Sequence, residues 1–424
     1  MFPAIPLKWS AFLFLLLSVS LLHAQPLAPA VPEAVGFSSE RLAFLTSTMQ
    51  GYVDEGALPG SVMLIARHGR IAYFESFGSS DLAHDVPMEK DAIFRIASQT
   101  KALVSVGIMM LQEEGRLLIT DPLGKYLPAF AETTVAVPTD DGYEVVKANR
   151  PITLRDLLTH SAGISYGYGP AADRWREAGI QGWYFADREE PIQATVNRMA
   201  GLPFDAQPGE QFVYGYNTDI LGAVVEVVSG QPLDAFLRER LLDPLCMTDT
   251  YFYLPPEKAD RLTVVYSPGD DGLEPAPAPG GMVGQGAYVD GPRQSFSGGA
   301  GLLSTTLDYA RFLQMMLDGG QYNGRRFLSR KTVELMTTPH LPDEQYTWVP
   351  GVGFGLGFSV VENLGRRGEL GSVGEFGWGG AYHSVYWADP VEDLIVVYFT
   401  QLIPNGGLDD HAKLRALIYQ ALVD

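Results

Sequence analysis

The chain has 424 residues, of which 46% are hydrophobic and 19% charged, and its formal net charge is −20. This length and composition are typical of a globular protein large enough for two packed lobes. The acidic balance argues against nucleic acid and against an acidic membrane surface as partners, because binding to phosphate groups needs a basic surface.

Residues 1–24 have the pattern of a secretory signal peptide. A short n-region with one lysine precedes an apolar run that ends at Leu22 and is too short to span a bilayer comfortably. We expect cleavage after Ala24, although Leu22 fits the small-residue rule poorly and leaves an uncleaved anchor as the alternative. The mature chain, residues 25–424, is then expected to be secreted or periplasmic, with no membrane role beyond export.

Cys246 is the only cysteine, so the chain can form no intramolecular disulfide. Export without disulfides suits a bacterial periplasm or the medium. The apolar neighbours of Cys246 in RLLDPLCMTDT predict that its side chain is buried and unreactive.

The order of the predicted elements indicates the fold class. A helix is expected over 38–56, followed by a β-hairpin that turns at His68–Gly69. The pattern is mostly helical from Ser98 to about residue 250 and becomes rich in Pro and Gly over 255–298, where we expect surface loops. A capped helix that starts after Thr305, several strands and a last helix complete the chain.

Strands at both ends with helices between them predict an α/β (α+β) fold. In this fold an antiparallel sheet is formed by both chain ends and flanked by helices, and a mostly helical lobe is inserted. The α/β lobe would comprise about 36–97 and 300–424, and the helical lobe about 98–299. A ligand is expected between the two lobes.

The segment FRIASQTKALVSVGIMML, residues 94–111, has a single charged side chain after Arg95, that of Lys101. A lysine is almost never fully buried without a partner. Ser98 lies three residues earlier, at the expected helix start, so the hydroxyl and the amine share one face. Backbone N–H groups at that start favour negative charge, and desolvation weakens the hold of the lysine on its proton. The pair predicts a serine nucleophile with an activating lysine.

Two further segments could complete such a site. Tyr214 lies in a turn between a strand-like approach and a helix, from which it could deliver a phenol or phenolate to the serine oxygen. The glycine cluster in GEFGWGGAYHSVYWADP, residues 374–390, lets the backbone approach a ligand closely. The N–H group of Ala381 could form an oxyanion hole together with the N–H group of Ser98.

In this order, the three segments resemble the serine β-lactamase and penicillin-binding-protein superfamily, and within it the class C β-lactamases and family VIII carboxylesterases. ITLRDLLTHSAGI and GGAGLLSTTLDYARFLQMML extend the resemblance over nearly all of the mature chain. The resemblance implies a β-lactamase-like fold with Ser98 as nucleophile, Lys101 as its proton partner and Tyr214 as general base and then acid. Whether Lys101 or Tyr214 accepts the first proton stays open.

Two departures from the lactamase pattern bear on the substrate. The Tyr-x-Asn of lactamases reads Tyr214–Gly215–Tyr216, so their contact to a substrate amide is missing or comes from Asn217. Their Lys-Thr-Gly reads Trp378–Gly379–Gly380, which removes the cation expected to meet a substrate carboxylate. The substrate-binding residues that we predict are Tyr216, Asn217, Trp378, Gly379, Gly380 and His383.

Several other residues have weaker claims. GISYG, residues 163–167, fits the G-x-S-x-G nucleophile elbow, but a helix-like segment precedes Ser165 where the elbow needs a strand. His160 is interpreted as a structural hydrogen-bonding residue near the site. The histidines lack metal-ligand spacing and no phosphate loop is evident, so we expect neither metal nor cofactor. Three aromatic residues could line an acyl pocket or simply belong to a surface loop: Trp175, Trp183 and Tyr184.

Three functions remain open from the sequence. The first is an exported serine hydrolase that cleaves a small-molecule ester, or an amide, through an acyl-enzyme on Ser98. The second is a β-lactamase or a D-amino-acid peptidase. The third is a non-catalytic binding or sensor protein, against which the three filled catalytic positions argue. The sequence does not indicate an oligomeric state.

Overall fold

A computed structural model describes residues 27–405 and 407–424 of the chain. The predicted signal peptide and its cleavage site lie outside these residues. Within the described residues, no single helix is long and apolar enough to cross a membrane, although the bent pair Asn217–Ser229 and Leu233–Leu242 meets the length and composition criteria together.

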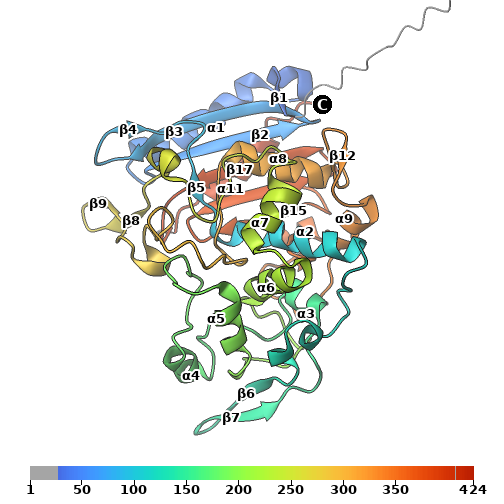
Figure 1. Cartoon of the computed structure of the whole chain (residues 1–424). Coiled ribbons are helices and arrows are strands. Elements are labelled where there is room, and N and C mark those ends of the chain that lie inside the picture. Colours follow the sequence, from blue (N-terminus) through green and yellow to red (C-terminus); the bar gives the residue numbers. More distant parts are fainter. Residues whose placement is uncertain (1–26, 406) are drawn as a thin grey trace, which may run out of the picture.

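The structure contains a nine-stranded sheet that is built from both ends of the described chain (Figure 1). The strand order is β1-β3-β2-β17-β16-β15-β14-β13, and β4 pairs with β3. The strands are β1 (Ala28–Pro29), β2 (Gly60–Arg67), β3 (Arg70–Asp81), β4 (Val86–Pro87), β13 (Val352–Phe354), β14 (Ser359–Val361), β15 (Phe376–Gly380), β16 (Ser384–Asp389) and β17 (Leu394–Thr400). The predicted sheet formed by both chain ends is therefore confirmed.

One pairing differs from the predicted antiparallel arrangement. β1 runs parallel to β3, with Ala28 opposite Arg70 and Pro29 opposite Ile71. Because proline has no backbone N–H, Pro29 suits such a short strand at the sheet edge. The predicted hairpin is present, with β2 and β3 pairing antiparallel on either side of the turn at His68.

Helices cover both faces of this sheet. Successive residues of β2 point to opposite faces, so Met63 packs toward one side and Leu64 toward the other. The first side is covered by α1 (Ser39–Asp54) and α11 (Asp410–Tyr419), whose apolar residues join the same cluster as Met63. The second side is covered by α8 (Thr306–Leu317). The α/β part thus has three layers.

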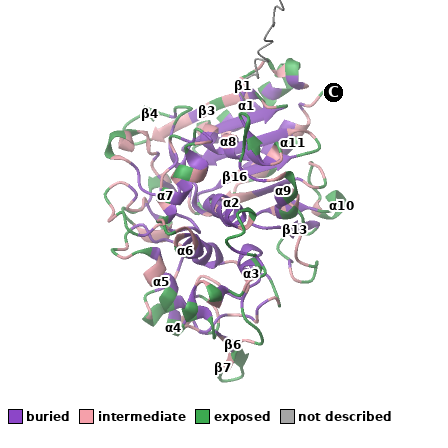
Figure 2. Cartoon of the chain, turned by 45° about the vertical axis from the view of Figure 1, so that its right-hand side comes forward, coloured by how far each residue is buried: buried purple, intermediate pink, exposed green. Residues whose placement is uncertain are grey.

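The helices from α2 to α7 form the lower part of the molecule in Figure 1. At its centre, α2 (Thr100–Glu113) is buried along nearly its whole length and packs beside α6 (Asn217–Ser229), as the purple ribbon of Figure 2 shows. The smaller helices around them are α3 (Leu154–Leu158), α4 (Ala172–Glu177), α5 (Ile192–Met199) and α7 (Leu233–Leu237). The lobe boundaries near residues 98 and 299 stay a prediction.

Two hairpins were not expected from the sequence. β6 (Thr134–Thr139) and β7 (Gly142–Lys147) protrude at the far end of the helical part, and β8 (Tyr266–Gly269) pairs with β9 (Gly272–Pro275) inside the stretch predicted to be loops. Both hairpins turn at the sequence Asp-Asp-Gly, and Asp-Gly between two strands is a recognised hairpin signal.

The prediction that Cys246 is buried is wrong. Its backbone adopts the left-handed region, with φ of 58°, where the preceding helical stretch ends, and the side chain faces solvent while Leu245 and Met247 are buried. The apolar neighbours therefore did not indicate the direction of the cysteine itself.

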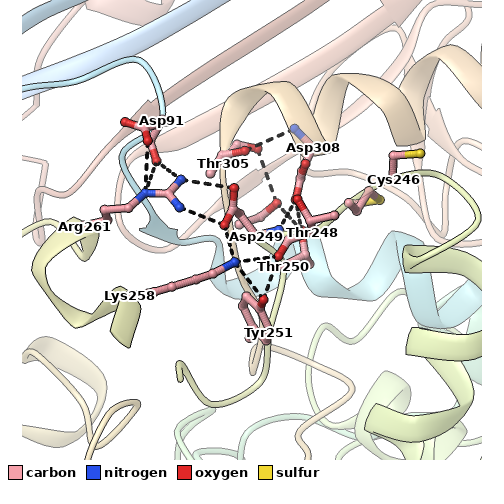
Figure 3. A network of polar contacts seen from close by, with 12 residues as sticks. Asp91, Cys246, Thr248, Asp249, Thr250, Tyr251, Lys258, Arg261, Thr305 and Asp308 are labelled. Atoms are coloured by element: carbon pink, nitrogen blue, oxygen red, sulfur yellow. Dashed lines mark hydrogen bonds and ion pairs between the residues drawn. The ribbon is translucent and has the colours of Figure 1, made fainter. Parts of the chain in front are cut away.

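A polar network just after Cys246 fastens this segment to α8 (Figure 3). The carboxylate of Asp249 accepts hydrogen bonds from Lys258 at 2.7 Å and from Arg261 at 2.9 Å. Asp308 on α8 accepts from the backbone N–H of Asp249 at 2.8 Å and from the hydroxyl of Thr250 at 3.1 Å. Burial raises the pKa of Asp308 to about 6. The network connects the segment that follows the helical part to α8, which covers one face of the sheet.

Candidate active site

Ser98 lies in a short, strained connection between a strand and a buried helix. β5 (Phe94–Arg95) pairs with β10 (Leu303–Ser304), and a 3-10 turn, η2 (Ala97–Gln99), leads into α2. Ala97 has φ of 43°, in a region that residues other than glycine rarely adopt. Such strain is found at functional sites and persists only where the surroundings enforce it. Here the carbonyl oxygen of Gln99 accepts a hydrogen bond from Tyr309 at 2.9 Å.

Lys101 lies one turn after Ser98 and is 2% exposed. Its ammonium group is 3.4 Å from the Ser98 hydroxyl oxygen, and it donates to the Tyr166 hydroxyl at 3.0 Å and to the Gly299 carbonyl oxygen at 2.8 Å. The predicted proximity of Ser98 and Lys101 is therefore present. The buried lysine has the polar partners that its position demands.

The loop before β10 connects Lys101 to a buried carboxyl group. Asp219 on α6 accepts a hydrogen bond from the N–H of Gly299 at 3.0 Å and from the hydroxyl of Ser297 at 2.6 Å. Residue 299 must be glycine, since a Cβ there would lie 2.3 Å from Asp219 Oδ2. The backbone of one residue, Gly299, thus joins the carboxyl of Asp219 through its N–H to the ammonium of Lys101 through its carbonyl oxygen.

The Asp219 carboxyl and the Lys101 ammonium also influence each other electrostatically. Burial raises the pKa of Asp219, while its hydrogen bond to Ser297 and the charge of Lys101 act in the opposite direction. We interpret Asp219 as the residue that positions Gly299, with its carboxyl close enough to Lys101 for the two groups to interact electrostatically.

Tyr214 lies beside the lysine on the turn that leads into α6. The ammonium of Lys101 is 4.5 Å from the centre of the Tyr214 ring. The Tyr214 hydroxyl accepts a hydrogen bond from the indole N–H of Trp378 at 3.0 Å. His160 packs against the same ring, with the ring centres 4.6 Å apart. The third predicted catalytic side chain, Tyr214, thus lies next to Lys101. The charge of the Lys101 ammonium and the Trp378 N–H would both stabilise a phenolate on Tyr214.

Tyr166 is a site residue that the sequence analysis missed. Its hydroxyl, not that of Tyr214, is the tyrosine oxygen that bonds to Lys101. Burial, followed by the neighbouring Tyr214 and Asp219, raises the pKa of Tyr166 well above its usual range, so its hydroxyl stays protonated. The two bonded residues are 65 positions apart in the chain, and no spacing rule connects them.

The structure corrects the predicted substrate contacts of Tyr216 and Asn217, which both lie in the interior. The Tyr216 hydroxyl donates to the Gly182 carbonyl oxygen at 2.9 Å, and its ring supports Tyr166 at 5.1 Å. The amide of Asn217 is 2.9 Å from Nδ1 of His160 and donates to the Val213 carbonyl oxygen at 3.1 Å. Both residues hold the Tyr214 turn in place instead of facing a substrate.

His160 lies where the sequence analysis expected it, as a buried hydrogen-bonding residue near the site. Burial lowers the pKa of His160 well below its usual range, and the charge of Lys101 adds to this effect. The ring is therefore neutral and is not a proton donor at physiological pH.

The glycine-rich end of β15 lies against the segment that carries Ser98. A Cβ on Gly380 would lie 2.6 Å from the carbonyl oxygen of Ile96, so only glycine permits this approach. Trp378, Gly379 and Gly380 are partly exposed, and Ala381 is exposed where the strand ends. This placement suits the predicted oxyanion hole of Ser98 and Ala381, whose role stays a prediction.

The predicted substrate contact of His383 is wrong. The residue is buried in the turn between β15 and β16, and its Nε2 lies 2.7 Å from Oδ1 of Asp410 at the start of α11. The His411 ring stacks on the His383 ring at 4.1 Å. His383 therefore ties the turn that carries Ala381 to α11, a link that only the tertiary structure creates.

The weaker candidates separate in the structure. Ser165 accepts a hydrogen bond from the N–H of Gly167 and does not follow a strand, as the sequence analysis indicated when it argued against a nucleophile elbow. Trp175 and Tyr184 are buried and belong to the core. The indole N–H of Trp175 donates to the Pro203 carbonyl oxygen, and the Tyr184 hydroxyl accepts from the N–H of Ala287. Trp183 is only partly buried and packs against the apolar cluster that contains Ala97 and Tyr382, with its ring 5.6 Å from that of Tyr382.

Comparison with known proteins places this geometry in a family. The family model described as Beta-lactamase matches residues 45–420. The chain is 34% identical to Protein Rv1367c of Mycobacterium tuberculosis, covering 85% of this chain and 90% of that protein. It is 29% identical to Esterase EstB of Burkholderia gladioli, covering 88% of this chain and 94% of that protein.

A solved structure shows the same fold. The structure of EstCE1, described as a hydrolase with promiscuous acyltransferase activity, has a TM-score of 0.79 and 28% identity and covers 90% of this chain and 99% of that one. The family model over residues 45–420 and the structural match over 90% of the chain both include most of the nine-stranded sheet and the helical part. The chain belongs to the β-lactamase family.

Proposed function

We propose that the chain is an exported serine hydrolase that cleaves neutral esters through an acyl-enzyme on Ser98. The observation that carries the proposal is the buried ammonium of Lys101, held 3.4 Å from the Ser98 hydroxyl oxygen and beneath the Tyr214 ring. Among the relatives, EstB is named an esterase and EstCE1 a hydrolase, which supports the reaction class.

The first half of the reaction forms the acyl-enzyme. Ser98 Oγ attacks the ester carbonyl carbon while its proton passes to the Lys101–Tyr214 pair. The oxyanion of the tetrahedral intermediate accepts hydrogen bonds from the N–H groups of Ser98 and Ala381. The intermediate collapses, the ester C–O bond breaks, and the leaving alcohol oxygen takes a proton from Tyr214.

In the second half, a water molecule attacks the acyl carbon and gives its proton to the same pair, and Ser98 recovers its proton as the acid leaves. Tyr166 keeps its own proton because burial raises its pKa well above the usual range. It therefore acts as a hydrogen-bonding partner that fixes the position of the Lys101 ammonium. Secretion or release to a periplasm completes the proposal and rests on the sequence of residues 1–24.

A lactamase or D-amino-acid peptidase function is the alternative, and Trp378 argues against it. Substrates of those enzymes carry a carboxylate, for which a cation at this strand is the natural partner. Trp378 offers an indole N–H instead, and that group already donates to Tyr214. A neutral substrate is therefore favoured.

The test compares the hydrolysis of p-nitrophenyl acetate and butyrate with that of nitrocefin, using Ser98→Ala as the blank. We expect ester turnover far above the blank, and a kcat/KM for nitrocefin lower than that for the esters by about 100-fold or more, the size of losing a charge-assisted contact to the substrate carboxylate. Turnover of nitrocefin above that of the esters would contradict the esterase proposal. Absence of turnover with all three, together with no labelling by a fluorophosphonate probe, would indicate a non-catalytic protein.

A further inference from the structure

An aromatic surface extends from the Tyr214 hydroxyl toward solvent. We call it the aromatic shelf; it comprises Phe212, Tyr214, Trp348 and Trp378. The Trp348 ring lies 5.4 Å from that of Tyr214, 4.9 Å from that of Phe212 and 6.2 Å from that of Trp378, which it meets nearly parallel at 21°. Trp348 is 53% exposed. A large indole face is thus open to solvent beside a candidate catalytic group.

A hollow of about 270 Å³ adjoins this shelf at Trp378 and Gly379. The nearby walls are apolar and include Tyr346, Val349 and Val352. This volume suits one ring-sized group.

Charged side chains occur at the other end of the hollow, but they satisfy one another. Glu375 accepts from Arg367 at 3.0 Å and from Arg415 at 2.7 Å, and all three are nearly buried. Glu369 lies 3.0 Å from Arg367. The two arginines therefore pair with the two glutamates, and none of these four residues offers an unpaired charge to a ligand in the hollow. An uncharged, apolar group fits it best.

The proton path decides which part of an ester reaches the shelf. The leaving alcohol oxygen must come within hydrogen-bond distance of the Tyr214 hydroxyl to receive its proton. The carbon attached to that oxygen is then next to Trp378 and Trp348, which touch Tyr214. A separate apolar cluster that contains Ala97, the neighbour of Ser98 in the chain, is available to the acyl group; it also includes Ala300 and Tyr382, and Trp183 packs against it.

We propose that the aromatic shelf and its hollow form a subsite for the alcohol part of the substrate, and that Trp348 makes the enzyme prefer esters of alcohols that carry an aromatic or alicyclic ring. The inference rests on the proposed ester hydrolysis and on Tyr214 as the acid. An exposed indole and a flat apolar ring gain from stacking and from the removal of both surfaces from water. Trp348 is the residue that sets this specificity.

The test uses acetate esters that differ only in the alcohol: ethyl, cyclohexylmethyl and benzyl acetate. All three give the same acetyl-enzyme, so differences arise before or during acylation. We expect wild type to have a higher kcat/KM for the two ring esters than for ethyl acetate. Trp348→Ala should reduce that preference by roughly tenfold, the size of one lost aromatic contact with its buried area, and should change ethyl acetate less than about twofold.

Two comparisons make the result specific. Phe44→Ala removes another exposed aromatic side chain, on α1, and should leave the preference unchanged. The ratio of ethyl butyrate to ethyl acetate reports the acyl side and should not respond to Trp348→Ala. A change in this acyl ratio without a change in the alcohol ratio would overturn the proposal, as would an equal loss with every ester.

A binding measurement separates this proposal from the proposed function. Ser98→Ala should bind benzyl alcohol, the product, more tightly than ethanol, as measured by isothermal titration calorimetry, and the double variant with Trp348→Ala should lose this binding. If wild type cleaves no ester, this binding still decides whether the subsite exists. Equal binding by the single and double variants would contradict it.

Discussion

Replacing Lys101 by methionine is expected to lower kcat/KM for p-nitrophenyl acetate by on the order of 10³-fold or more. The variant keeps an unbranched apolar stem but removes the amino group, which bonds to Ser98, Tyr166 and Gly299. Without the amino group, the pair that takes the Ser98 proton loses one of its two members, and Tyr214 loses the cation that lies 4.5 Å from the centre of its ring. Steady-state kinetics against Ser98→Ala measure the loss.

The matched control is Lys90→Met, since Lys90 is a half-exposed lysine that pairs with Glu75. This variant should keep wild-type activity. Circular dichroism and the midpoint of thermal unfolding show whether Lys101→Met still folds, because the Gly299 carbonyl oxygen loses its donor. A folded Lys101→Met protein with more than about a tenth of wild-type activity would contradict the assigned role of the lysine, since general acid–base groups contribute at least about 100-fold.

The two tyrosines near Lys101 are expected to respond differently to removal of their hydroxyl groups. Tyr214→Phe should lower kcat by about 10²- to 10⁴-fold, the range for a general acid–base group. The Trp378 N–H and the Lys101 ammonium both lie where they would stabilise its phenolate. Tyr166→Phe should cost only about tenfold, because it removes one hydrogen-bonding partner of the Lys101 ammonium and leaves the proposed acid–base group, Tyr214, in place.

Kinetics with leaving groups of different basicity distinguish the two roles. The loss in Tyr214→Phe should grow from p-nitrophenyl acetate to ethyl acetate, since the more basic alkoxide needs a proton to leave, whereas the loss in Tyr166→Phe should be the same for both. Tyr168→Phe, at an exposed tyrosine two residues from Tyr166, serves as the control. The reverse pattern would assign the acid–base role to Tyr166.

Local spacing was enough to predict the centre of the site. Ser98 and Lys101 are one helical turn apart, so their contact follows from the helix itself. The fold class also followed from the order of strands and helices, because strands at the two chain ends have few partners other than each other. The Ser98–Lys101 contact and the fold class could therefore be predicted from residue spacing and element order alone.

The rest of the site depends on contacts between distant segments. Tyr166 reaches Lys101 from the loop between α3 and α4, and Asp219 is linked to Lys101 through Gly299 because α6 packs against α2. Tyr216 and Asn217 follow Tyr214 directly in the chain, yet their side chains turn inward at the start of α6. Sequence neighbours of a site residue thus need not face the substrate, and side-chain direction at a helix start is set by tertiary packing.

The partner of His383 illustrates the same limit. Asp410 lies 27 residues later, at the start of the last helix, and nothing in the local pattern connects the two. The exposed side chain of Cys246 is another case, since one left-handed residue at a helix end reversed the direction that its apolar neighbours indicated. Both outcomes depend on backbone geometry that residue type does not determine.

The most direct test of the account is the site of covalent modification. Wild type is mixed with a p-nitrophenyl ester, quenched in acid within the first turnovers, digested and examined by mass spectrometry. The account predicts one acyl group per chain, on the peptide that contains Ser98, and no adduct in Ser98→Ala. An acyl group on Ser165 or on any other residue, or hydrolysis that proceeds unchanged in Ser98→Ala, would contradict it.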